Sequence, residues 1–416
     1  MPPIDFPSTS PAARATVSRR AAERLHSGHV WVYQSDVLSI EPTESSAGLL
    51  TVHDQAGRLL GTALWSPTSQ IALRLISRSA IEPYAFLPLL RKRLRAAIAR
   101  REGMLDEGTD SCRLVFAEAD ELPGLVIDKY AGLAIFQILA AGLDTPEVRA
   151  AVVEELVAAL GSGLETVLER PDPRIRELEA LGPPAPGPFW SAGSSLDEAR
   201  TATEFRLNGL RFLYDANAGQ KTGAFLDQRL NYRLAAQYGH GEALDVCTYQ
   251  GGFALHLATT CRTVTGLDVS EAALEVAERN LALNRDALGG IEVDWVKGDA
   301  FAVMRDWSDA GAEYDTIVLD PPAFAKTKRA AESALRGYKE LNLRAFKMLR
   351  PGGTLVTCSC SHHVPLDEFQ AVVAAAAGDS GRRVRLLERT GAAPDHPVIL
   401  TIPETEYLKC LVLEIE

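Results

Sequence analysis

A strand, a tight glycine turn and the start of a helix are predicted by Ala243-Leu244-Asp245-Val246-Cys247-Thr248-Tyr249-Gln250-Gly251-Gly252-Phe253, with the helix continuing over residues 254–259. Such a unit places backbone N–H groups and a helix N-terminus beside a ligand above the sheet. The paired glycines let that ligand lie against the backbone. The turn lacks the G-x-G-x-x-G pattern of a dinucleotide site. A ligand without phosphates, above all S-adenosylmethionine, fits better, although an ordinary βα turn of another α/β protein has the same pattern.

Beyond this turn, strands alternate with helices at regular spacing, which is typical of a doubly wound, mostly parallel sheet. The expected strands are residues 243–247, 263–267, 292–297, 315–319 and 354–358, and the expected helices include 271–284 and 335–349. Asp268, Asp299 and Asp320 each follow one of these strands. Because ligands of open α/β sheets bind at the carboxyl ends of the strands, the three carboxylates are predicted to face one site.

The positions of these acids suggest an adenosine lying along the sheet edge. Asp268, about 20 residues beyond the glycine turn, can accept hydrogen bonds from both ribose hydroxyls. Asp299 can accept from the adenine amino group, which places the sulfonium tail over Gly251 and Gly252. Taken singly, each carboxylate is also compatible with a helix cap or a turn residue.

The turn Asp320-Pro321-Pro322-Ala323-Phe324 differs in kind from the other two. Its prolines stiffen the turn and donate no N–H, which leaves carbonyl oxygens to accept from an exocyclic amine. Phe324 can stack on a flat ring. Asp320, Pro321, Pro322 and Phe324 are therefore predicted to form a nucleobase site.

Composition restricts the class of protein. The chain has 416 residues, of which 46% are hydrophobic and 24% charged, as in a soluble globular protein of two or three domains. No apolar run reaches the ~18 residues of a membrane span, and the first residues do not form a secretory signal. Six cysteines without a repeating pattern predict reduced thiols in the cytoplasm and no zinc site, so no metal is expected.

Net charge and local patterns give an outline of the rest of the chain. The net charge of −12 argues against non-specific coating of nucleic acid, although the basic clusters at 14–24 and 91–101 can face RNA or form solvated surfaces. Residues 16–77 are expected to be an all-β barrel, followed by helices at 83–98 and 145–160 and by strands at 112–116, 125–128, 133–138 and 165–170. A loop rich in proline, glycine and serine is expected at 182–193.

Several motifs resemble the RlmI family of S-adenosylmethionine-dependent large-subunit ribosomal RNA methyltransferases. They are residues 217–229, 249–253 and 320–324, Gly337-Tyr338-Lys339, Ser359-Cys360-Ser361 and Pro403-Glu404-Thr405-Glu406-Tyr407-Leu408-Lys409, with His29-Val30-Trp31-Val32-Tyr33 and residues 118–125 nearer the N-terminus. The resemblance covers nearly the whole chain. It implies an N-terminal PUA-like RNA-binding domain at 1–80, a central α+β domain at 81–185 and a class I Rossmann-like methyltransferase domain at 186–416.

The resemblance also implies a reaction, 5-methylation of a cytosine in 23S rRNA, with Cys360 as the nucleophile. The residues expected to hold S-adenosylmethionine are Lys221, Thr222, Phe225, Tyr249, Gly251, Gly252, Phe253, Asp268, Asp299 and Asp320.

The chemistry of cytosine is consistent with a thiol nucleophile. Carbon 5 does not attack a methyl sulfonium unaided, whereas addition of a thiolate at carbon 6 creates a nucleophilic enamine. Asp320 can stabilise that adduct through ring nitrogen 3, and the base must leave its stack to reach the pocket. Other RNA cytosine-5 enzymes commonly have Pro-Cys after the aspartate, but Ala323 follows the prolines here, so the base for the carbon 5 proton is left open between Asp320, His362 and water. Cys358 is expected to pack in the core.

Three alternatives remain from the sequence. The first is a methyltransferase acting on a purine or an exocyclic amine without a thiol. The second is a nicotinamide oxidoreductase, which the missing glycine pattern disfavours, and the third is a ribosome-assembly factor without catalysis. The expected partner is 23S rRNA and not a membrane, and the oligomeric state is open, with a homodimer compatible with the sequence.

Overall fold

The computed structural model describes residues 13–42, 47–183, 187–193, 195–217, 224–325 and 331–416. These residues form two compact units. The first comprises the described residues of Met1–Gly103, Arg113–Thr201 and Val398–Ile402, and the second comprises those of Met104–Cys112, Ala202–Pro397 and Pro403–Glu416. The division into three domains inferred from the sequence remains a prediction.

The N-terminal sheet of the first unit has the strand order β2-β6-β5-β4-β1-β3. Its elements are β1 (Arg14–Val17), α1 (Arg19–His26), β2 (Trp31–Tyr33), β3 (Val37–Glu41), β4 (Gly48–His53), β5 (Leu59–Trp65) and β6 (Ile71–Ser77). The three strands expected between 49 and 76 are confirmed, but the expectation of an all-β segment is wrong because α1 interrupts it. Ala21, Ala22 and Leu25 give this helix a buried face, and the Ser18 side chain caps it by accepting from the Ala21 N–H.

Part of the basic cluster at 14–24 is used within this unit. Arg20 and Arg24 both donate to the buried carboxylate of Asp36, at 2.9 Å each. These two arginines therefore stabilise the fold of the N-terminal sheet, whatever the remaining basic residues contact.

A second sheet of the first unit has the strand order β11-β10-β9-β8-β7. Its elements are α2 (Pro83–Ala99), β7 (Ser111–Phe116), β8 (Leu125–Tyr130), β9 (Leu133–Ile138), α3 (Pro146–Leu160), β10 (Thr166–Glu169), α4 (Pro173–Leu178) and β11 (Pro188–Ser191). The α+β character expected from the sequence is confirmed. Within the expected loop at 182–193, however, β11 pairs antiparallel with β10.

The second unit contains a seven-stranded sheet with the order β16-β15-β14-β17-β18-β20-β19. Its elements are β12 (Ala202–Leu207), β13 (Leu210–Asp215), α5 (Arg229–Tyr238), β14 (Glu242–Val246), α6 (Gly252–Leu257), β15 (Thr263–Asp268), α7 (Glu271–Asn284), β16 (Glu292–Lys297), α8 (Ala300–Asp309), β17 (Tyr314–Leu319), α9 (Ala331–Met348), β18 (Leu349–Ser359), α10 (Leu366–Ser380), β19 (Val384–Thr390) and β20 (Lys409–Ile415). Strands β14 to β18 pair in parallel, and β20 is antiparallel to both of its neighbours. The doubly wound, mostly parallel sheet is confirmed.

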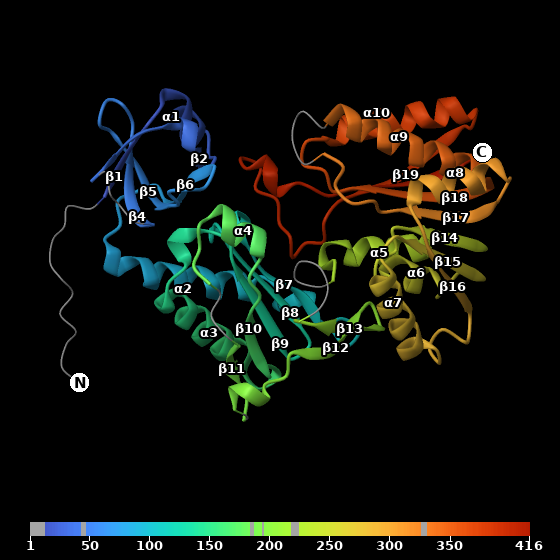
Figure 1. Ribbon diagram of the computed structural model, residues 1–416, viewed down its shortest axis with the longest axis horizontal. Helices are drawn as coiled ribbons and strands as arrows, with labels where there is room; N and C mark the ends of the chain where they lie inside the picture. The colour runs from blue at the N-terminus through green and yellow to red at the C-terminus, as the bar shows by residue number, and fades with distance from the viewer. Residues whose placement is uncertain (1–12, 43–46, 184–186, 194, 218–223, 326–330) are drawn as a thin grey trace. The chain divides into compact units, whose positions relative to one another are not determined.

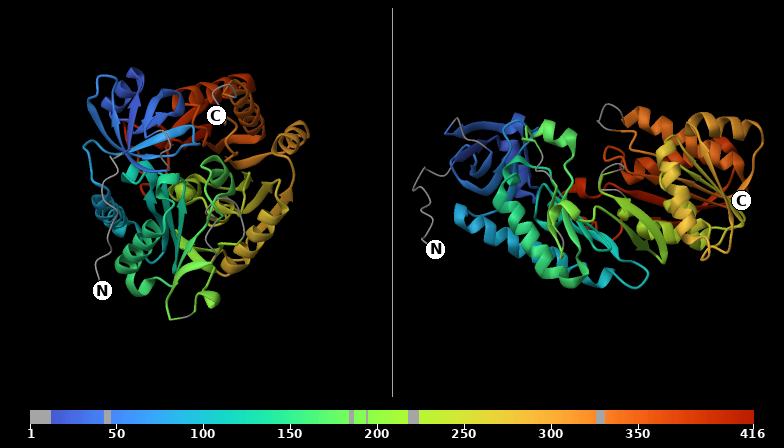
Figure 2. Two further views of the ribbon diagram at one scale, coloured as in Figure 1. Left: turned by 60° about the vertical axis from the view of Figure 1, so that its left-hand side comes forward. Right: turned by 60° about the horizontal axis from the view of Figure 1, so that its bottom comes forward.

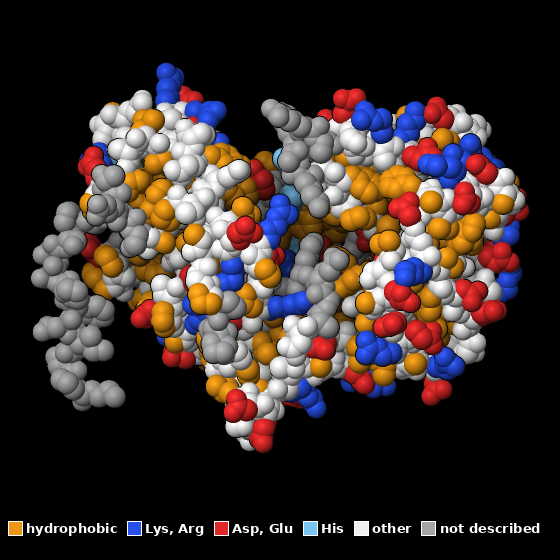
Figure 3. Space-filling model, viewed as in Figure 1, with side chains coloured by type: hydrophobic (Ala, Val, Ile, Leu, Met, Phe, Trp, Pro, Cys, Tyr) orange, Lys and Arg blue, Asp and Glu red, His pale blue; other side chains and the backbone are white. Residues whose placement is uncertain are grey.

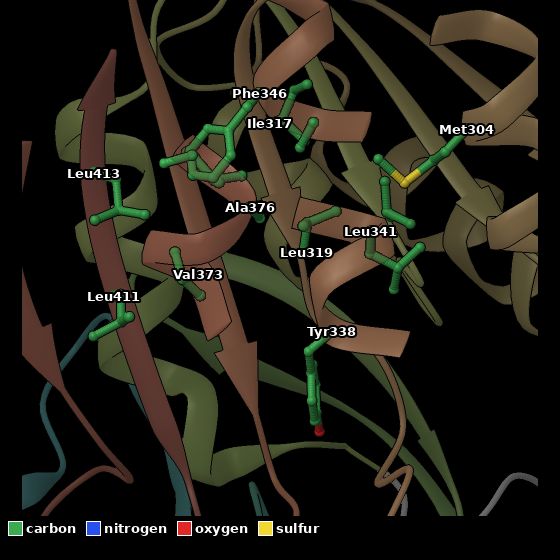
Figure 4. Close-up of a cluster of buried hydrophobic side chains, with 14 of the residues drawn as sticks. Met304, Ile317, Leu319, Tyr338, Leu341, Phe346, Val373, Ala376, Leu411 and Leu413 are labelled. Atoms are coloured by element: carbon green, nitrogen blue, oxygen red, sulfur yellow. The ribbon is translucent and has the colours of Figure 1, made fainter. Parts of the chain in front are cut away.

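Helices cover both faces of this sheet (Figures 1 and 2), with α8, α9 and α10 together on one face and α5, α6 and α7 on the other. The core under α9 and α10 contains Ile317 and Leu319 of β17, Phe346 of α9 and Leu411 of β20. Figure 4 shows Tyr338 at one end of this cluster, with its hydroxyl pointing away from Phe346 and Ile317. That hydroxyl reaches the sheet edge where β18 ends.

The described part of the chain was searched for membrane-spanning helices and for metal sites. None of the described helices combines the length and the apolarity needed to cross a membrane. It also contains no cluster of three or more potential metal-ligating side chains, counting His, Cys, Asp and Glu.

Candidate active site

The glycine turn between β14 and α6 has a strained backbone. Cys247, Tyr249 and Gly251 all have positive φ angles, 64°, 52° and 84°, a conformation that only glycine adopts without cost. A Cβ on Gly252 would lie 2.6 Å from the Tyr232 ring. The backbone conformation at Gly251 and the packing at Gly252 therefore each require glycine. The sequence predicted these glycines only as clearance for a ligand.

Asp245, which sequence reasoning did not single out, supports this turn from below. One carboxylate oxygen accepts from the Thr248 hydroxyl (2.5 Å) and from the Ala254 N–H at the start of α6 (2.8 Å). The other oxygen, Oδ1, is buried without a hydrogen-bond partner among the described residues. Burial, the largest cause, raises the pKa of Asp245 to about 7. A buried acceptor of this kind suits a cationic donor from a bound ligand.

Asp268 lies where β15 ends and joins two loops. Its carboxylate accepts from the Tyr249 N–H at 2.9 Å and from the Ser270 N–H at 2.8 Å, so it is held rigidly beside the glycine turn. Asp299 is exposed and caps α8 by accepting from the Ala302 N–H at 3.0 Å. The cap does not occupy all lone pairs of the Asp299 carboxylate, so an adenine amino group can share it.

The predicted carboxylates converge on one place in the structure. Cys247 is half-buried in the turn, and its pKa is raised by burial first and then by the charges of Asp268, Asp320, Asp245 and Asp299. The local potential is therefore negative. S-adenosylmethionine carries a sulfonium and an ammonium group, so this set of residues fits it.

Two residues predicted to bind the cofactor, Lys221 and Thr222, lie outside the described residues. Phe225 is described, and its ring meets the Tyr249 ring edge-on with 5.2 Å between centroids. Phe253 is buried against Tyr232. Phe225 and Tyr249 thus extend the wall of the glycine turn, whereas Phe253 supports it from the core.

A chain of amide side chains holds Asp320, and sequence reasoning missed it. The Gln228 amide nitrogen donates to Asp320 Oδ1 at 2.9 Å. The Gln228 oxygen accepts from Asn231 at 2.6 Å, and Asn231 in turn accepts from the Thr390 hydroxyl at 2.7 Å. These contacts fix the orientation of the Asp320 carboxylate at the end of β17.

The residues after Asp320 meet the end of β18. The Cys360 thiol donates to the Pro321 carbonyl, with 3.9 Å between sulfur and oxygen. Pro321 is buried and Pro322 exposed. Phe324 packs against Tyr338 and Phe301, with centroid distances of 4.9 and 5.7 Å. The loop therefore brings together the predicted nucleobase residues and the predicted nucleophile.

Two buried serines flank Cys360. The hydroxyls of Ser359 and Ser361 each lie 2.9 Å from the Tyr338 hydroxyl. Cys358, two residues earlier, is fully buried opposite Cys410 on β20, as expected for a core residue. Cys360 is half-buried, so it is the more accessible of the two thiols. His362 is exposed, and its ring lies 5.5 Å from that of Tyr407.

Comparison with known proteins gives the family of the chain. A PUA-like domain model matches residues 15–78, and an S-adenosylmethionine-dependent methyltransferase model matches residues 185–411. The ribosomal RNA large subunit methyltransferase I of Pseudoalteromonas translucida is 36% identical over 93% of this chain and 95% of its own length. That of Shewanella amazonensis is 37% identical over 93% and 95%. The chain belongs to the ribosomal RNA large subunit methyltransferase I family. The resemblance to the RlmI family is thereby confirmed.

Solved structures agree with this fold. A putative S-adenosylmethionine-dependent methyltransferase from Streptococcus mutans superposes with a TM-score of 0.78, at 18% identity, over 96% of this chain and 99% of its own. A putative methyltransferase crystallised with SAH gives the same TM-score and identity. With the family match, the chain is an S-adenosylmethionine-dependent methyltransferase, and the nicotinamide alternative loses its support.

Proposed function

We propose that this protein transfers a methyl group to carbon 5 of a cytosine in large-subunit ribosomal RNA, with Cys360 as a covalent nucleophile. The relatives named above support the RNA class, and the PUA-like domain suits RNA binding. The observation that carries the proposal is the placement of the half-buried Cys360 thiol against the carbonyl of Pro321, next to Asp320. A thiol and a carboxylate at one sheet edge are the two groups that the reaction requires.

The proposed reaction has three steps, which are addition of the thiolate, transfer of the methyl group and elimination of the thiolate. The Cys360 thiolate adds to carbon 6, and the electrons of the 5,6 double bond make carbon 5 nucleophilic while nitrogen 3 takes up a proton from water and is stabilised by the Asp320 carboxylate. The bound cofactor supplies an electrophilic methyl group, which carbon 5 takes, leaving a neutral thioether. A base then removes the carbon 5 proton, the sulfur–carbon 6 bond breaks, nitrogen 3 returns its proton to water, and the double bond and thiolate are restored. Asp320 or water remains the proposed base, with His362 as the third choice.

Each binding residue has a proposed role. Asp268 accepts from the ribose hydroxyls and Asp299 from the adenine amino group. Asp245 adds a buried acceptor for the cationic end of the cofactor. Pro321, Pro322 and Phe324 border the target base, and the remaining proposed cofactor residues are Lys221, Thr222, Phe225, Tyr249, Gly251, Gly252 and Phe253. These binding residues orient the cofactor and the base and exclude water around the reacting atoms.

Substitution of Cys360 by Ala tests the proposal. With S-adenosylmethionine and ribosomal RNA from cells lacking the protein, mass spectrometry of nucleosides should find 5-methylcytidine formed by the wild type and none by Cys360→Ala. Cys358→Ala is the matched control, because that thiol is buried two residues away and should leave the product in place. RNA carrying 5-fluorocytidine should trap a covalent complex through Cys360, since fluorine cannot leave as the proton does.

Two results would favour the alternatives. Full methylation by Cys360→Ala, with the product on a purine or an exocyclic amine, would remove the covalent mechanism and keep the methyltransferase. Tight cofactor binding by the wild type without transfer to any ribosomal RNA fragment would favour an assembly factor.

A further inference from the structure

We propose that Lys409 is a positioning residue for Cys360, whose ammonium group anchors the loop after β18 and provides the positive charge that stabilises the Cys360 thiolate. The inference rests on the proposed function, because it concerns the same nucleophile.

The sheet register brings Lys409, from a distant part of the sequence, beside the backbone that carries Cys360. Lys409 is the first residue of β20 and pairs with Ser359 across the antiparallel β18–β20 ladder. Its ammonium nitrogen donates to the carbonyl of Ser361 at 2.7 Å and to that of Tyr407 at 2.8 Å. Lys409 therefore holds the backbone at Ser361, the residue that follows Cys360, through a hydrogen bond.

The burial of this ammonium group is unusual. Lys409 is only 5% exposed, and among the described residues no carboxylate forms an ion pair with it. Two neutral carbonyls satisfy two of its three donors. Burial lowers the pKa of Lys409 to about 8, while the charges of Cys360 and Glu406 act in the opposite direction. A buried cation without a directly paired carboxylate is stabilised by any anion that forms beside it, and thiolate formation at Cys360 supplies one.

The other charged and titratable groups that the structure describes around Cys360 either disfavour a negative charge on its sulfur or lie at the periphery of the site. Asp320 on the β17 loop is negative, and the hydroxyl of Tyr338 on α9 is held by two serines. Glu406 is exposed, and Asp227 accepts from the Tyr407 hydroxyl at 2.5 Å. Among the described residues, Lys409 is a cation whose charge interacts with that of Cys360.

Cys247 is a second thiol at the carboxyl ends of these strands, and the charged neighbours that the structure describes for it are carboxylates. It is half-buried like Cys360, but burial and four neighbouring carboxylates raise the pKa of its thiol. Cys247 is therefore an internal reference for the effect of Lys409.

The test is alkylation by iodoacetamide from pH 5.5 to 9.5, with peptide mass spectrometry reporting Cys360 and Cys247 separately. In the wild type, the pH midpoint for Cys360 should lie below the ~8.5 of a free cysteine. In Lys409→Met, the rate at pH 7 should fall about tenfold and the midpoint should rise by roughly one unit or more, as removal of a nearby opposite charge predicts. Lys409→Arg should retain most of the wild-type rate, and Cys247 should not respond to either variant.

A merely structural role for Lys409 predicts a different outcome. In that case folded Lys409→Met, checked by thermal unfolding and by calorimetry of cofactor binding, would alkylate Cys360 with the wild-type pH profile, and the inference would be overturned. If Lys409→Met does not fold, the wild-type midpoint decides alone: a value at or above ~8.5 overturns the inference, and a lower value supports it.

Failure of the inference can be told apart from failure of the proposed function. Dependence of Cys360 alkylation on Lys409, together with full methylation by Cys360→Ala, would keep the pairing and remove the covalent mechanism. Loss of methylation in Cys360→Ala, with alkylation independent of Lys409, would remove the pairing alone.

Discussion

Replacement of Asp245 by Asn is predicted to remove a pH dependence from the stability of the second unit. Burial, the largest cause, raises the pKa of this carboxyl to about 7; the hydrogen bonds from Thr248 and Ala254 oppose the shift, and the charge of Asp268 adds to it. Because the unfolded value is ~3.9, the folded state keeps a proton that the unfolded state releases. The associated stabilisation is complete below the unfolded pKa and is lost as the pH rises through about 7.

The magnitude follows from these two pKa values. With a folded pKa of about 7 and an unfolded pKa of ~3.9, the cofactor-free protein should lose ~1.4 kcal/mol of unfolding free energy between pH 6 and pH 8 through Asp245 alone. Asn does not titrate in this range, and its oxygen can still accept from Thr248 and Ala254. The difference between the two pH profiles therefore isolates the contribution of the carboxyl group.

Urea titrations of the cofactor-free protein at pH 6 and pH 8 would measure the effect, with pulsed hydrogen exchange of a β14 peptide reporting the unfolding of the seven-stranded sheet. Asp294→Asn, on strand β16 of the same sheet, is the matched control, because Asp294 is exposed and should leave the pH profile unchanged. Parallel profiles for the wild type and Asp245→Asn would refute the raised pKa of this buried carboxyl.

Three further substitutions test the packing around the site. Gly252→Ala should lower the free energy of unfolding of the second unit by about 1–3 kcal/mol in urea titrations, because its methyl group would lie 2.6 Å from the Tyr232 ring. Gly378→Ala is the control, because a methyl group there meets nothing within 4 Å and should stabilise α10 slightly. Gln228→Leu should lower kcat, measured at saturating S-adenosylmethionine, by roughly tenfold to a hundredfold, as loss of a ~1.5–3 kcal/mol hydrogen bond to Asp320 predicts. Tyr338→Phe should lower the melting temperature, because the loss of one hydroxyl removes a partner from two buried serines at ~1–3 kcal/mol.

The sheet of the second unit was predictable because its signals are local. Strands such as β17 are runs of β-branched and aliphatic residues, and α7 begins after a serine that caps it. Helix α8 was missed, although its apolar residues recur at helical spacing after Asp299. Helix α1 was missed because its five charged or histidine side chains leave a short apolar face, and β11 because proline and glycine surround it.

The predicted site was less complete because its supporting contacts are non-local. Gln228 and Asp320 are 92 positions apart, and Lys409 is 48 positions from the carbonyl of Ser361 that it holds. A single sequence contains no signal for such pairs, which depend on the register of β18 against β20 and on the order of the strands. Asp245 could have been found from the sequence, since an acidic residue inside an otherwise apolar strand requires a partner.

The direction in which Cys360 points follows from the alternation of side chains at the end of β18. On an extended backbone, residues two apart face the same side. Ser359 and Ser361 both reach the Tyr338 hydroxyl, so the residue between them must face the opposite side, where the Pro321 carbonyl lies. Burying two serine hydroxyls there is tolerated only because Tyr338 satisfies both. The direction of the Cys360 side chain is thus set by the hydrogen bonds of its two neighbours, and a change at either serine should alter the reactivity of Cys360 without removing its sulfur.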